Sequence, residues 1–181
     1  FGSMKLGCGL SVLSTPASKL KILPKGASMG PSGGPLGYLG YGPFGRDTTT
    51  KSNLTKVAAL DANQTLEVRL VHRGAECLEQ VLKSLWLMGA LGGIGSRNRR
   101  AWGSVLLETD TKFPELSQLA QCRDIEQYRN SLTQGLTMLA PVAGRRNAAD
   151  LWWTALSRDT RIVLSRRTFP SWREAMEDLG R

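Results

Sequence analysis

The chain has 181 residues, of which 41% are hydrophobic and 22% are charged, so it can form a hydrophobic core and is not a disordered tail. Its formal net charge of +9 favours a polyanionic partner. The three cysteines (Cys8, Cys77 and Cys122) are widely spaced and form no Cys-x-x-Cys pair, which argues against a disulfide framework or a zinc site and suits a reducing cytoplasm. No apolar run reaches transmembrane length and no signal-peptide pattern is present, so we expect no membrane partner.

The N-terminal part predicts two short strands, at residues 9–14 and 19–23, bounded by Pro16 and Pro24. Residues 26–50 are rich in Gly, Pro, Ser and Thr and predict a loop that is too long to be a simple connection. Residues 40–45 satisfy the Gly-x-Gly-x-x-Gly pattern literally. Pro43 lies inside it and no helical apolar stripe follows, which argues against dinucleotide binding.

The same loop carries rings that could stack on bases and cations that could bind phosphates. These residues are Tyr38, Tyr41, Phe44, Arg46, Lys51 and Lys56. We take Tyr41, Arg46 and Lys51 as candidate RNA-binding residues. The alternative is that the aromatic rings only pin the loop to its own core.

Residues 65–71 predict a strand with Leu66, Val68 and Leu70 on one face. His72, the one histidine of the sequence, continues that face, and a histidine at a strand end is more often packed than catalytic. From Gly74 or Ala75 to Ala90, apolar residues at i, i+3 and i+4 predict an amphipathic helix that stops at two glycines.

The stretch that follows, residues 91–105, combines closely spaced glycines, three arginines in four positions, and a tryptophan. Glycine backbones can form an anion-binding concavity, arginine forks match phosphate oxygens, and an indole ring can stack on a base. The candidate RNA-binding residues are Gly92, Gly93, Gly95, Ser96, Arg97, Asn98, Arg99, Arg100 and Trp102. The competing interpretation is a tight helix-to-strand connection with a solvated arginine rim. The position of the stretch argues against a P-loop or a dinucleotide site, because those motifs follow a strand and open a helix.

A strand predicted at residues 102–108 completes a strand–helix–turn–strand succession, which is the last half of a ferredoxin-like unit. The C-terminal part predicts helices at residues 114–122, at 124–139 (broken at Gly135 and ended by Pro141) and at 147–156, and a strand at 161–165. A capping box, Ser171-x-x-Glu174, opens a final helix. The sequence therefore predicts an α+β protein: part of a ferredoxin-like (RRM-like) domain at residues 1–110, then a mainly helical extension at 111–181. We expect further chain before Phe1 and after Arg181.

Residues 92–105 (GGIGSRNRRAWGSV), together with residues 37–43 (GYLGYGP) and the opening Phe-Gly-Ser, resemble the RAMP superfamily of CRISPR-associated RNA-binding proteins. The pattern is closest to that of the first subunit of the type III-B (Cmr) effector complex, and residues 171–176 (SWREAM) agree with it. The resemblance implies ferredoxin-like domains with a glycine-rich loop and a cytoplasmic role in antiviral defence. It also implies binding of guide RNA or guide–target duplex, with other RAMP subunits as partners and no metal or cofactor.

Two other functions compete with RNA binding by a non-enzymatic subunit. Some RAMP proteins are metal-independent endoribonucleases that cut CRISPR precursor RNA with a histidine as general base, a role that His72 would have to fill here. A protein-interaction scaffold is the third. Because the sequence shows no catalytic constellation, we expect the chain not to be an enzyme.

Overall fold

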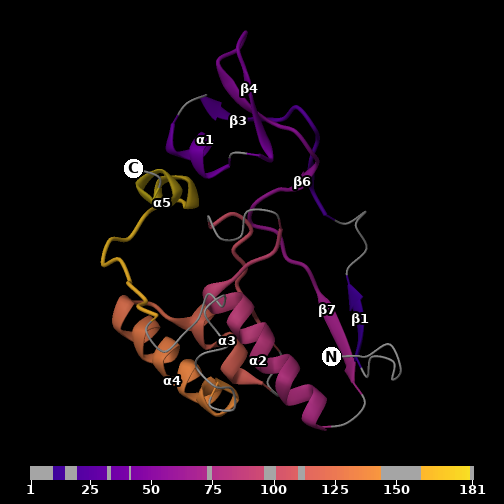
Figure 1. Ribbon diagram of the computed structural model, residues 1–181, viewed down its shortest axis with the longest axis vertical. Coiled ribbons are helices and arrows are strands. Elements are labelled where there is room, and N and C mark those ends of the chain that lie inside the picture. Colours follow the sequence, from indigo (N-terminus) through magenta and orange to yellow (C-terminus); the bar gives the residue numbers. More distant parts are fainter. Residues whose placement is uncertain are drawn as a thin grey trace.

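The computed structural model describes residues 10–14, 20–31, 34–40, 42–72, 75–95, 101–109, 113–143 and 160–179 (Figure 1). These residues form an α+β fold with small antiparallel sheets and five helices. The strands are β1 (Leu10–Ser14), β2 (Ile22–Leu23), β3 (Ser28–Pro31), β4 (Phe44–Asp47), β5 (Ser52–Thr55), β6 (Ala59–Leu60) and β7 (Val68–His72). The helices are α1 (Pro35–Leu39), α2 (Ala75–Leu91), α3 (Pro114–Gln121), α4 (Ile125–Ala143) and α5 (Trp172–Leu179).

Three antiparallel sheets account for these strands: β1 with β7, β2 with β6, and β3–β5–β4. The strand predicted at residues 9–14 is confirmed over β1, whereas the one predicted at 19–23 shrinks to the two residues of β2. Figure 1 places β3, β4, α1 and α5 at one end of the molecule and α2, α3 and α4 at the other. We call the group β3–β5–β4 with α1 and α5 the sheet unit.

The long loop predicted at residues 26–50 is wrong, because β3, α1 and β4 lie within it.

Asp47 makes the turn between β4 and β5: its carboxylate accepts hydrogen bonds from the Thr49 amide (2.9 Å) and the Thr50 hydroxyl (2.5 Å). Thr55, only 3% exposed, accepts from the Ala27 amide (3.0 Å) and donates to the Pro24 carbonyl (2.7 Å). Side-chain hydrogen bonds thus hold a sheet whose sequence has little apolar alternation.

Helices α2, α3 and α4 pack around Trp86, Leu116 and Leu132, which are 3%, 8% and 4% exposed. The helices predicted at residues 75–90 and 114–122 are confirmed as α2 and α3. The predicted break at Gly135 and end at Pro141 are wrong, because α4 continues to Ala143.

The C-terminal helix α5 packs against α1, where Met176 joins Leu36 and Leu39 in a second core cluster. The predicted capping box is confirmed: the Glu174 amide donates to the Ser171 hydroxyl over 3.3 Å at the start of α5. The sequence assigned α5 to the helical extension, but its contacts are with the sheet unit.

Two predicted strands, at residues 102–108 and 161–165, are wrong. Both segments are irregular, but their apolar residues still contribute to the core: the Leu107 and Leu164 side chains pack against the cluster around Trp86. The closing strand of a ferredoxin-like unit is therefore absent from residues 101–109, where the sequence predicts it. The helix predicted at residues 147–156 lies outside the described residues. In the part of the chain that the structure covers, no helix combines the length and apolar composition needed to cross a bilayer.

Candidate nucleic-acid interface

The glycine-rich stretch begins where α2 ends, with the Gly92 amide still donating to the Met88 carbonyl (3.1 Å). Gly95 has φ of +107°, a conformation that other residues rarely adopt, and nothing lies within 4 Å of the position its Cβ would take. The Ile94 amide then donates to the Gly103 carbonyl over 2.8 Å. This hydrogen bond joins the two ends of a turn that we call the arginine turn, residues 94–103.

Only the ends of the arginine turn are described. Gly92, Gly93, Gly95 and Trp102 belong to the described residues, whereas Ser96, Arg97, Asn98, Arg99 and Arg100 lie outside them, as does Tyr41. Gly103, which the sequence did not single out, has φ of +76° and lies against the Ile94 carbonyl. Ala101, two residues before Gly103, also has positive φ (63°), which is uncommon for a residue with a Cβ.

Trp102 anchors the arginine turn to the sheet unit. Its ring meets Phe44 of β4 edge-on, with centroids 4.8 Å apart, and Trp172 of α5 at 5.8 Å. Ala101 and Trp102 also pack against the Leu36–Leu39–Met176 cluster. These contacts give Trp102 a packing role, and the base-stacking role expected for it stays a prediction.

The sheet unit has two faces with different surroundings. Opposite residues of β4 and β5 share a face, so Arg46 lies on the side of Asn53, and Gly45 on the side of Leu54. Helix α1 covers the first face, where a Cβ on Gly37 would be 3.0 Å from the Asn53 side chain. The second face is not covered by α1.

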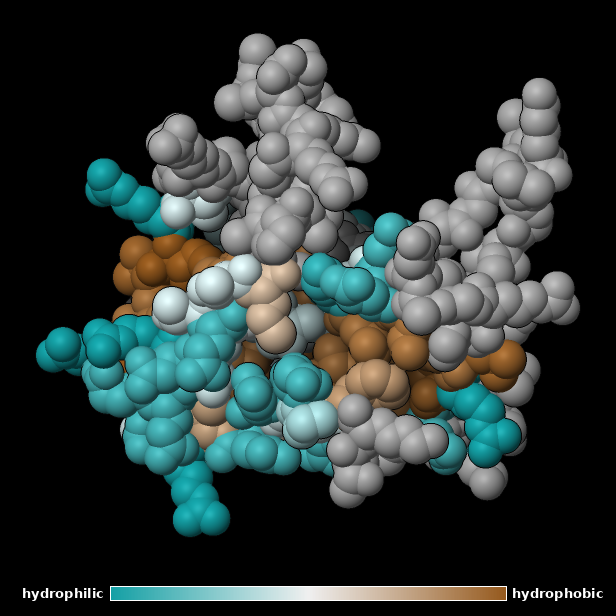
Figure 2. Space-filling model, turned by 90° about the horizontal axis from the view of Figure 1, so that it is seen from below, coloured by the Kyte–Doolittle hydropathy of each residue, from teal (hydrophilic) through white to brown (hydrophobic). Residues whose placement is uncertain are grey.

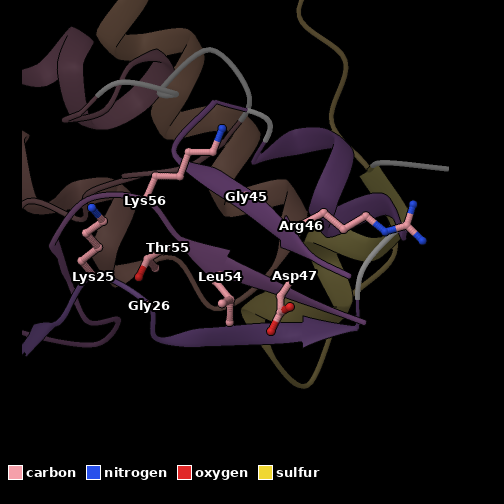
Figure 3. A pocket seen from close by; sticks show the side chains of 8 residues that line it. All are labelled: Lys25, Gly26, Gly45, Arg46, Asp47, Leu54, Thr55 and Lys56. Carbon is pink, nitrogen blue, oxygen red and sulfur yellow. The ribbon is translucent and has the colours of Figure 1, made fainter. Parts of the chain in front are cut away.

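A concavity of about 230 Å³ opens beside Gly45 and Leu54 (Figure 3). Gly45 contributes no side chain, and the Lys56 stem lies over it: a Cβ on Gly45 would be 2.9 Å from Lys56 Cε. Figure 3 shows Lys25 and Lys56 reaching out at one end of the concavity and Arg46 at the other. The lining residues are Lys25, Gly26, Gly45, Arg46, Asp47, Leu54, Thr55 and Lys56.

The cations around this concavity have no carboxylate partner within ion-pair distance among the described residues. They are Lys25, Arg46 and Lys56, all exposed. Asp47 also lines the concavity, and the hydrogen bonds from Thr50 and then Thr49 lower the pKa of its carboxyl group, so it keeps its negative charge. Lysine and arginine therefore outnumber the one carboxylate in the lining of the concavity.

The structure brings Arg46 and Lys51 of the predicted site onto one small unit and adds Lys25 and Lys56 to them. The sequence shows Lys56 only as part of a basic loop, and Lys25 belongs to no pattern in the sequence. Lys25 lies close to β5 because Gly26, with φ of +86°, turns the chain, and the Gly26 amide donates a hydrogen bond to the Thr55 carbonyl (2.8 Å). Within the described residues, no group of three or more His, Cys, Asp or Glu is placed to hold a metal ion.

Comparison of the chain with protein-family models, with curated proteins and with solved structures gives no match.

Proposed function

We propose that the chain binds RNA through the phosphate backbone, with the basic concavity of the sheet unit as a principal contact. The supporting observation is that Lys25 and Lys56 line the concavity beside Gly45 and form no ion pair with the described part of the protein. A phosphate in the concavity would meet the ammonium groups of both lysines, which supply charge-assisted hydrogen bonds.

The resemblance of residues 92–105 to RAMP proteins extends this proposal. It favours a non-enzymatic, cytoplasmic RNA-binding subunit of a CRISPR type III-B effector that contacts guide RNA or guide–target duplex beside other RAMP subunits. The ferredoxin-like class is part of the proposal, on the strength of the resemblance and of the β7–α2 succession. In such complexes the guide supplies sequence specificity and the protein contributes backbone contacts. Incubation with precursor RNA without metal distinguishes this role from an endoribonuclease.

Replacing both Lys25 and Lys56 with alanine is expected to weaken RNA binding at every base sequence. If each lysine neutralises one phosphate, the slope of log K against log salt should become shallower by roughly 1.4, using about 0.7 per phosphate for single strands. Filter binding of homopolymeric RNAs at several salt concentrations measures both quantities.

The matched control removes two lysine or arginine charges elsewhere. Lys83 on α2 and Arg129 on α4 pair with Glu79 and Glu126, so the Lys83→Ala/Arg129→Ala variant also lowers the net charge from +9 to +7. Equal weakening by the two double variants would show that only net charge matters. A parent protein that does not bind RNA would refute the function itself.

Arg99→Ala tests the part of the site that rests on sequence alone. Arg99 lies between the anchored ends of the arginine turn, so its removal should leave the melting temperature unchanged and weaken RNA binding by roughly 1–3 kcal/mol. Melting curves and RNA affinities of parent and variant measure this, with Arg97→Ala as a neighbour. Parent-like affinity in both variants would assign the arginines to a solvated rim.

A further inference from the structure

A second cavity, of about 500 Å³, lies at the junction of α2, α3 and α4, on elements that do not form the basic concavity. Trp86, Leu116 and Leu82 line it together with Phe113 and Met138. The indole of Trp86 is only 3% exposed and belongs to the core cluster, so one wall of the cavity is a fixed part of the fold. Met138 is 42% exposed and stands at the opening. Figure 2, seen from below, shows hydrophobic residues reaching the surface between hydrophilic ones.

The rim of this cavity carries two glutamates and one lysine, whereas the chain as a whole is basic. Glu79 and Glu115 lie on it with one lysine, Lys83, whose ammonium is 2.6 Å from the Glu79 carboxylate. Glu79 is thereby neutralised, and hydrogen bonding to Lys83 lowers its pKa. Glu115 has no cationic partner within ion-pair distance among the described residues. An apolar cavity with an unpaired carboxylate at its edge is complementary to an apolar group beside a positive charge.

We infer that this cavity docks a basic amphipathic helix of a partner protein, which inserts apolar side chains between α2, α3 and α4 and places a lysine or arginine beside Glu115. The volume suits a few aliphatic side chains rather than a flat contact, and apolar anchors that fill pockets supply most of the binding energy of such interfaces. The proposal does not depend on RNA binding.

The test uses two short synthetic helical peptides with leucines on one face, one with lysines and the other with glutamates on the remaining positions. Fluorescence anisotropy with the full chain measures their affinities. The parent is expected to bind the lysine peptide at least about tenfold more tightly than the glutamate peptide. Equal binding of both peptides, or binding of neither, would overturn the proposal.

Two variants locate the binding. Met138→Gln keeps the size and helix propensity of the side chain but removes an apolar contact, so it should weaken binding of the lysine peptide about tenfold. Glu115→Lys should weaken binding of the lysine peptide about fivefold and strengthen binding of the glutamate peptide. Glu126→Lys, with the same change of charge on α4 but outside the cavity, should leave both affinities near those of the parent. Parent-like binding by Met138→Gln, or equal effects of the two charge reversals, would place the peptide elsewhere and overturn the inference.

Discussion

Gly135→Ala should destabilise the protein, although alanine is the better helix former. A Cβ at this position would lie 1.9 Å from Trp86 Cζ2 and 2.3 Å from Cε2, and Trp86 is too buried to move aside freely. Overpacking of this kind costs about 3 kcal/mol or more at the upper end of its usual range. The gain in helix propensity is only about 1 kcal/mol, so we expect a net loss of roughly 2 kcal/mol or more.

Thermal unfolding measures this loss, which corresponds to a decrease of about 4–8 °C in melting temperature for a chain of this size. Gln134→Ala is the matched control, because Gln134 is the exposed neighbour on the same helix and both residues favour helix. A melting temperature that rises in Gly135→Ala would mean that helix propensity outweighs the contact between α4 and Trp86.

The second large effect is expected for Gly103→Ala. Gly103 has φ of +76°, and its Cβ would lie 1.7 Å from the Ile94 carbonyl oxygen. No side-chain rotation relieves a contact with backbone, so the variant must break the Ile94–Gly103 hydrogen bond that closes the arginine turn. Strain and the lost bond together should cost about 3 kcal/mol.

Gly95→Ala separates conformational strain from collision. Gly95 also has positive φ, but no atom lies within 4 Å of its Cβ position, so only the strain of about 1–3 kcal/mol applies. Denaturant unfolding of both variants should therefore rank Gly103→Ala as the less stable. Equal stability would show that the turn rearranges easily and does not hold a fixed shape.

The helical part was largely predictable from the sequence, because α2 and α3 follow apolar periodicity and α5 opens with a capping box. The errors in α4 have a tertiary cause. A glycine inside a helix is read as a break, yet here it makes room for Trp86, and this cannot be recognised without knowing that α2 crosses α4 at that point.

The sheet unit was missed because polar side chains rather than apolar alternation determine it. Asp47 shapes the β4–β5 turn and Thr55 links β5 to the chain around Pro24 and Ala27, through bonds between residues up to 31 positions apart. The same limit applies to the candidate site. Arg46 and Lys51 were found as basic residues of a loop, but the approach of Lys25 to Lys56 requires the bend at Gly26.

The packing of α5 against α1 also has a consequence for the synthesis of the chain. Strands β3, β4 and β5 and helix α1 are complete once residue 55 has been made, but their core contains Met176. At the usual rate of elongation, roughly ten seconds pass between these two points. During that interval Leu36 and Leu39, which become 7% and 6% exposed in the finished fold, have no α5 to cover them. The first sheet to be completed therefore waits for α5, and chaperones that bind apolar surface should capture nascent chains halted before residue 172.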